Sequence, residues 1–196
     1  MANTTKKLIQ GFGINDLDYP IKNCPYYERW KSLICRCYSD KFHIYNKSYK
    51  NSEVCEEWKY LSNFKSWMES KDWENKVLDK DILYPGNKLY SPKTCIFVSK
   101  EINSLIIKPT GRDLPLGAYK NIQNNKYDSK ISMYTKRIYL GSFLTPFEAH
   151  RCWQINRSKY IEEVAMKQED EILKGALLRI SNSIIDDYMN FRETKY

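Results

Sequence analysis

The sequence lacks the apolar runs and cysteine pairs that mark several classes of protein. No stretch of its 196 residues approaches the ~20 consecutive apolar residues that span a bilayer. The amino-terminal MANTTKKLIQGFGIND has no continuous apolar run of the kind found in secretory signals. The six cysteines include no CxxC pair, and disulfides are not expected. These absences predict a soluble, cytoplasmic protein with no membrane partner.

The amino-acid composition is typical of a folded protein, and the positive charge is unevenly distributed along the chain. Hydrophobic residues make up 42% and aromatic residues 14%, which excludes a disordered chain. Residues 116–160 hold eight Lys/Arg against two acids and so carry +6 of the net +8. Positive charge concentrated in one module is typical of a protein that binds a polyanion, and an ordinary solvated basic surface is the alternative.

The amino-terminal half predicts an arm, two helices and a strand–loop–strand–helix segment. Residues 1–24 contain glycines and a Tyr-Pro pair that discourage regular structure, so we expect a loosely tethered arm. Apolar residues recur at helical spacing in 25–38 and again from Trp58 to Met68. Beyond them we expect strands at 77–81 and 95–98, an irregular loop between these strands, and a helix with Ser99 as its N-cap.

The order of motifs in this half resembles the HNH endonucleases, in the variant found among phage proteins. The matching stretches are YERW and RCY, VCEEW, SNFKSWM and LDKDIL, followed by Gly86-Asn87, Ser91-Pro92 and Cys95. The resemblance implies a ββα-metal domain over residues 25–107, in which Asp79 and Asn103 hold Mg²⁺ or Mn²⁺. It also implies that Asn87 orients the group that activates water. The catalytic candidates are therefore Asp79, Lys80 and Asn87.

One position departs from this family's pattern. The family's general base is a His directly after the first Asp, and this chain has Lys80 there. A lysine is protonated at neutral pH unless it is desolvated, so it cannot accept a proton from water, although it can hold a phosphate as a point charge. Two functions therefore remain open: a homing or nicking endonuclease, and a catalytically inactive DNA-binding regulator or host-takeover protein.

Four residues of this half are candidate zinc ligands. The candidates are Cys37, His43, Cys55 and Cys95, and three of the four lie beside the motifs that resemble the phage proteins. Their spacing is irregular, unlike the paired knuckles of strong zinc motifs. The alternative is a set of buried core thiols, because free cysteine is among the most buried residue types.

The carboxyl-terminal half predicts a linker at 108–115 and then a sheet covered by a helix. Three short strand-like runs lie between Leu116 and Phe143, and Thr145-Pro146 begins a helix. The motifs LGAYK, KY and RIYLGSFLTPFEAHRCW resemble the AP2/integrase-type DNA-binding domain, here over residues 116–165. The resemblance implies that the sheet enters the major groove of double-stranded DNA. The corresponding DNA-binding candidates are Tyr119, Lys120, Lys126, Lys130, Arg137 and Tyr139.

The last segment, 166–196, predicts an amphipathic helix over 166–192. Its apolar stripe is expected to pack on the core, and pairing with a second copy in a homodimer is the alternative to a monomer. The whole chain is thus expected to have an α+β fold, with an HNH-like core, an AP2-like sheet and helix, and a carboxyl-terminal helix. The function implied by the two resemblances is sequence-directed DNA binding by a phage-type protein in an infected bacterial host cell.

Overall fold

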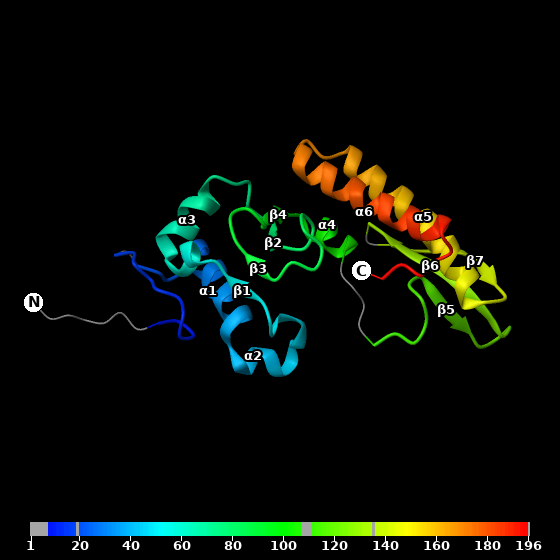
Figure 1. Ribbon diagram of the computed structural model, residues 1–196, viewed down its shortest axis with the longest axis horizontal. Helices are drawn as coiled ribbons and strands as arrows, with labels where there is room; N and C mark the ends of the chain where they lie inside the picture. Colours follow the sequence, from blue (N-terminus) through cyan, green and yellow to red (C-terminus); the bar gives the residue numbers. More distant parts are fainter. Residues whose placement is uncertain (1–7, 19, 107–110, 135, 196) are drawn as a thin grey trace, which may run out of the picture. The chain divides into compact units, whose positions relative to one another are not determined.

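The computed structural model describes residues 8–18, 20–106, 111–134 and 136–195, and it divides the chain into two compact units, residues 1–99 and 100–196 (Figure 1). Helices and sheets occur in both units, so the expected α+β class is confirmed. Residues 1–7 and 19 of the expected arm, residues 108–110 of the expected linker and the turn residue Thr135 lie outside the described residues. Among the described helices, none combines the length and apolar character needed to cross a membrane.

The first unit is built around one buried cluster supplied mostly by two helices. The helix predicted at 25–38 is observed with those bounds, and Pro25 occupies its first turn, where a missing N–H leaves no bond unmade. Trp30 is fully buried and donates its indole N–H to the carbonyl of Trp58 at 2.7 Å. The helices of this unit are α1 (Pro25–Tyr38), α2 (Asp40–Tyr45), η1 (Lys47–Tyr49), η2 (Glu56–Lys59) and α3 (Leu61–Glu69).

Residues 8–18 do not form the loosely tethered arm that their composition suggests. The amide of Ile14 donates to the carbonyl of Lys59 at 2.8 Å, and apolar side chains of this segment pack against the buried cluster. Gly13 permits the close approach, because a Cβ at this position would lie 2.8 Å from the Trp30 ring. The prediction of a loose arm was therefore wrong for these residues, since three apolar side chains and one glycine attach them to the core.

Two short strand pairs complete the first unit. β1 (Glu53–Val54) pairs in parallel with β3 (Leu89–Tyr90), and β2 (Val77–Asp79) pairs antiparallel with β4 (Ile96–Val98). The first predicted strand, 77–81, ends two residues early. Its end is set by Asp79, whose carboxylate accepts the amides of Asp81 and Ile82 and turns the chain out of the strand.

The second unit consists of a three-stranded antiparallel sheet and three helices. The strand order is β5–β6–β7, and α5 packs on one face of this sheet. The Thr145 side chain and Glu148 form a capping box at the start of α5, as the Thr-Pro motif predicts. The elements are α4 (Lys100–Leu105), β5 (Ala118–Asn121), β6 (Lys126–Met133), β7 (Lys136–Phe143), α5 (Pro146–Met166) and α6 (Glu171–Met189).

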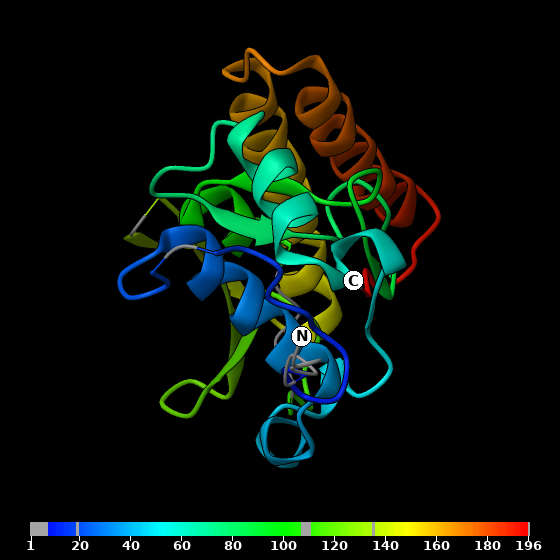
Figure 2. The same cartoon turned by 90° about the vertical axis from the view of Figure 1, so that its left-hand side faces the viewer.

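α5 and α6 lie side by side as a hairpin (Figure 2). Between them the Ser158 and Ser181 hydroxyls form a buried hydrogen bond at 2.8 Å. α6 begins later than the predicted residue 166 because α5 extends to Met166 and Asp170 then caps a new helix. Its buried residues pack within the unit, which confirms the expectation of core packing: Leu173, Ala176, Leu177, Ser181 and Ile184.

The helix expected to complete the ββα segment belongs to the second unit. The Tyr160 hydroxyl of α5 donates to Glu101 of α4 at 3.0 Å, and the Arg157 guanidinium donates to the carbonyl of Leu105 at 2.5 Å. By its internal contacts the chain divides between Ser99 and Lys100, that is, between β4 and α4.

A bulge interrupts the alternation of faces along β7. Between β6 and β7 the register runs from Ser129 with Gly141 to Lys130 with Tyr139, which leaves Leu140 without a partner on β6. Gly141 adopts a φ of 144°, where a glycine is favoured. Leu140 therefore does not continue the buried face as its period-2 pattern suggests.

Candidate functional site: a basic sheet face and the Asp79 loop

The face of the sheet that points away from α5 collects most of the predicted DNA-binding side chains. Cross-strand partners lie on the same face, so the register assigns the residues of all three strands. The buried Ala118 and Ile131 mark the face covered by α5. The opposite face, called here the outward face, carries Tyr119, Asn121, Lys126, Asp128, Lys130, Ser132, Arg137, Tyr139 and Ser142.

Lys120 is the exception among the predicted residues. It pairs with Tyr127, which is on the face covered by α5, so Lys120 lies on the opposite face from Lys126 and Lys130. The side chain is exposed, but strand alternation directs it away from the other five candidates. The structure thus brings together five of the six predicted DNA-binding residues.

Tyr119 is the centre of the positive charge on this face. The Cζ atoms of Arg112 and Arg137 lie 4.7 Å and 4.5 Å from its ring centroid, and Lys130 Nζ lies 5.7 Å from it. Burial by itself raises the pKa of Tyr119, but the two guanidinium groups together outweigh burial and lower it. A positive cluster thus surrounds one aromatic ring.

One acidic residue, Asp128, lies among the outward-face residues, and its negative charge is neutralised by a neighbouring lysine. Asp128 is 7% exposed and forms an ion pair with Lys130 at 3.0 Å. The Lys130 ammonium holds the pKa of Asp128 below its usual range, and hydrogen bonds from Asn121 and Ser142 act in the same direction. Asp128 therefore orders the lysine, while Lys126 and Arg137 remain as exposed cations.

Sequence reasoning missed Arg112. It lies in the segment assigned as a linker, yet its guanidinium donates to the carbonyls of Pro115 and Ala118, the latter at 2.7 Å. These bonds fix the chain that leads into β5 and place the guanidinium beside Tyr119. An arginine a few residues before the LGAYK motif is the only signal in the sequence that points to it.

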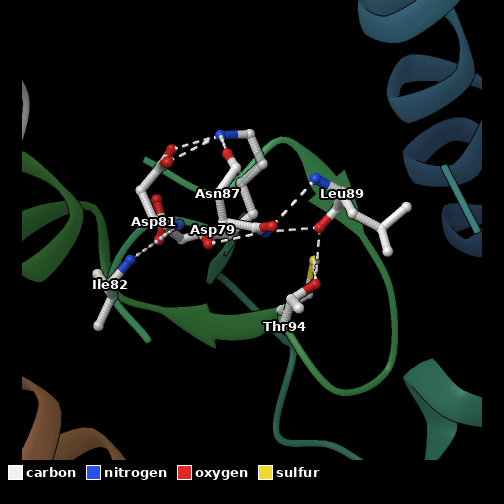
Figure 3. A network of polar contacts seen from close by, with 8 residues as sticks. Asp79, Asp81, Ile82, Asn87, Leu89 and Thr94 are labelled. Carbon is white, nitrogen blue, oxygen red and sulfur yellow. Dashed lines mark hydrogen bonds and ion pairs between the residues drawn. The ribbon is translucent and has the colours of Figure 1, made fainter. Parts of the chain in front are cut away.

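In the first unit, Lys80 takes part in a polar network at the end of β2, and Figure 3 shows its partners Asp81 and Asn87. It is 6% exposed, and its ammonium donates to both carboxylate oxygens of Asp81 at 2.8 Å and to the carbonyl of Asn87 at 2.6 Å. These contacts use the three donors of the ammonium group. Lys80 is therefore a structural cation that holds the loop 81–87 against β2.

Asn87 is likewise engaged with the backbone (Figure 3). Its amide nitrogen donates to the carbonyls of Lys80 and Leu89, and its amide oxygen accepts from the Leu89 N–H at 3.1 Å. The preceding Gly86 has a φ of 77°, which gives the turn that the Pro-Gly pair predicts. These contacts give Asn87 the role of a clamp between the two ends of the loop.

Asp79 accepts two backbone amides through one carboxylate oxygen, at 2.8 Å and 2.7 Å. Burial raises its pKa, and the two amide bonds oppose this rise. Asn103 lies on α4 in the second unit, so the expected metal pair is not assembled within either unit. In the described part of the chain, moreover, no three His, Cys, Asp or Glu side chains are grouped as ligands for a metal ion. The expected Mg²⁺ or Mn²⁺ site therefore stays a prediction.

Three of the four candidate zinc ligands, the cysteines, lie in or against the buried cluster, and His43 lies on α2, which has no buried residue. Cys37 and Cys95 belong to the buried cluster of the first unit, and burial raises the pKa of each thiol to about 12. Burial also raises the pKa of Cys55. His43 Nε2 lies 2.9 Å from the carbonyl oxygen of Arg36. Burial of Cys37 and Cys95 in this cluster is the environment expected of core thiols.

Comparison of the chain with known protein families, with curated proteins and with solved structures found no match.

Proposed function

We propose that this protein binds double-stranded DNA through the outward face of its three-stranded sheet and does not cleave it. The proposal is carried by one observation: three cations and two tyrosines from all three strands share the face that α5 leaves uncovered. These residues are Tyr119, Lys126, Lys130, Arg137 and Tyr139. The resemblance of LGAYK and the strand–helix motif to AP2-type domains supports the same surface.

The chemistry of this face suits a duplex. Lysine and arginine side chains contact phosphates and position the protein, while a guanidinium also reads guanine in the major groove. Arg137 is exposed and reaches over the Tyr119 ring, so it is the candidate for a base contact. Lys126 is exposed at the start of β6 and is the candidate for a phosphate contact.

The residues at the end of β2, Asp79 and Lys80, and the loop 81–87 that follows them support DNA binding without hydrolysis of the DNA. A general base needs a free lone pair, and the ammonium group of Lys80 donates all its protons to Asp81 and Asn87. The Asn87 amide is occupied by backbone groups of the same loop. Asp79 at the end of an antiparallel strand pair still favours a second candidate, a metal-dependent nicking endonuclease.

The binding surface is tested with two lysines that differ only in the face they occupy. Fluorescence anisotropy on a labelled duplex measures the affinity of the protein and of Lys126→Gln and Lys120→Gln across a salt series. Each lost phosphate contact reduces the slope of log K against log salt by ~0.9, so Lys126→Gln should show this change and Lys120→Gln should not. Equal effects of the two substitutions would refute the assigned face.

Cleavage is tested separately on supercoiled plasmid with Mg²⁺ or Mn²⁺. We expect no nicked product from a preparation that binds duplex DNA in the anisotropy assay. Nicking that disappears in Asp79→Asn would instead establish the second candidate, because this substitution keeps an oxygen acceptor for the Asp81 and Ile82 amides and removes the charge.

A further inference from the structure

A pocket of about 330 Å³ opens where β6 continues past the start of β5. β5 begins at Ala118, and the last backbone bond between the two strands runs from the Lys130 amide to the Gly117 carbonyl at 2.9 Å. β6 continues to Met133, and its Ser132 lines the pocket together with Leu105 of α4. Side chains of α5 complete the lining. All these elements belong to the second unit.

Three cations line this pocket, and no acidic side chain is among the lining residues that the structure describes: Arg112, Lys130 and Arg157. Arg157 is 7% exposed and donates to the carbonyls of Ser132 and Leu105, which hold its guanidinium in place. Arg112 is held by backbone carbonyls as well. Guanidinium groups fixed in this manner favour an anion with several oxygens, of which phosphate is the commonest in proteins.

Aromatic rings form much of the remaining lining: Tyr119, Tyr134, Trp153 and Tyr160. Tyr134 and Tyr160 contact each other edge to face, with ring centroids 5.3 Å apart. The Tyr160 hydroxyl accepts the Tyr134 amide at 2.6 Å, which fixes this corner of the pocket. Nucleobases of any sequence stack on such rings, and the volume lies within the range of small-ligand sites, ~300–1,000 Å³.

The pocket is continuous with the proposed DNA-binding surface. Tyr119, Lys130 and Ser132 line the pocket and also belong to the outward face. A DNA strand bound on the outward face therefore passes the opening of the pocket. A base of this strand that leaves the base stack would contact the aromatic rings, and its phosphate would contact the cations. Extruding a base costs least where it is unpaired already.

From the cations, the aromatic rings and their continuity with the outward face, we propose that the pocket holds one unpaired nucleotide of a duplex bound on the sheet. This inference rests on the proposed DNA binding. The rings stack on the base, and Arg112, Lys130 and Arg157 contact its phosphate. The protein accordingly prefers duplexes that contain a bulged nucleotide over fully paired duplexes.

The experiment compares a fully paired duplex with the same duplex carrying one bulged 2-aminopurine nucleotide. Anisotropy measures both affinities, and 2-aminopurine fluorescence reports the environment of the extra base. We expect binding to the bulged duplex to be about tenfold tighter, with a change in fluorescence as the base stacks on a ring.

Substitutions of two tyrosines distinguish binding in the pocket from binding on the sheet surface. Tyr134 and Tyr139 are 52% and 58% exposed, but only Tyr134 is among the described pocket residues. Tyr134→Ala should abolish the preference for the bulge and leave the affinity for paired duplex unchanged. Tyr139→Ala should weaken both complexes equally and keep the preference. Ser104→Trp, at an exposed α4 position that lines the pocket, should block the extra base if Tyr134→Ala folds poorly.

The outcomes distinguish this inference from the proposed function. Equal affinity for the two duplexes, or a preference that survives both Tyr134→Ala and Ser104→Trp, overturns the pocket assignment and leaves DNA binding intact. Failure to bind either duplex overturns the proposed function and the pocket assignment together.

Discussion

Protonation of His150 should weaken the attachment of the carboxyl-terminal tail in the second unit. His150 is fully buried on α5, with Nδ1 2.7 Å from the Leu116 carbonyl oxygen and Nε2 3.1 Å from the Thr194 backbone nitrogen. A carbonyl can only accept and an amide N–H can only donate. The ring is therefore neutral, with its proton on Nδ1 and a lone pair on Nε2 facing Thr194.

The direction of the pH effect follows from the environment of the ring. Burial lowers the pKa of His150 below its ordinary value of 6.5, Arg151 acts in the same direction, and the Leu116 carbonyl, Glu193 and Asp187 oppose them. Because the folded protein takes up this proton at lower pH than the unfolded chain, stability falls as the pH drops below 6.5. Within the window between the folded and unfolded pKa values the loss is about 1.4 kcal/mol per pH unit.

The assay is urea denaturation between about pH 8 and about pH 5, which gives the free energy of unfolding at each pH. The chain has two histidines, so His43→Gln is the natural control for His150→Gln. A glutamine amide can donate to Leu116 and accept from Thr194 without titrating. We expect His150→Gln to flatten the pH dependence and His43→Gln to retain it. A slope that persists in His150→Gln, or disappears in His43→Gln, would refute the reasoning.

Three further predictions concern stability and reactivity. Gly117→Ala should destabilise the second unit by ~2–4 kcal/mol in thermal unfolding, because its Cβ would lie 2.1 Å from an indole carbon, whereas Gly86→Ala, with open space around it, should cost only ~1 kcal/mol. Asp79→Ala should cost ~1–3 kcal/mol through two lost amide bonds, and Asp79→Asn should be nearly neutral in the same assay. Cys37 and Cys95, with pKa values of about 12, should react with iodoacetamide only as fast as the protein unfolds; rapid modification of the native protein would contradict their burial.

Local patterns were sufficient to predict the longer helices and the three-stranded sheet, but not the short elements α2, β1 and β3. The helix at 25–38 follows from apolar residues at helical spacing behind a proline, and the start of α5 follows from a Thr-Pro cap with a glutamate three residues on. The three strands of the sheet lie within the ranges that alternation and turn residues indicate. These signals act over a few residues, so they can be recognised in one sequence.

Which side chains share a site depends on contacts between distant residues. A single unpaired residue, Leu140, changes the faces of β7, and strand pairing assigns Lys120 to the face opposite Lys126. The clustering of Arg112 with Tyr119 and Arg137 likewise joins three segments of the chain.

Helix periodicity, caps, turns and charge are properties of neighbouring residues, so the sequence indicates the longer helices, the three-stranded sheet and the region where positive charge accumulates. Three features follow from tertiary contacts instead: Lys80 is a buried structural cation, residues 8–18 pack against the core, and α4 belongs to the second unit. Those outcomes depend on burial and on partners far away in the chain, such as Glu101 with Tyr160, and residue spacing does not encode these partners.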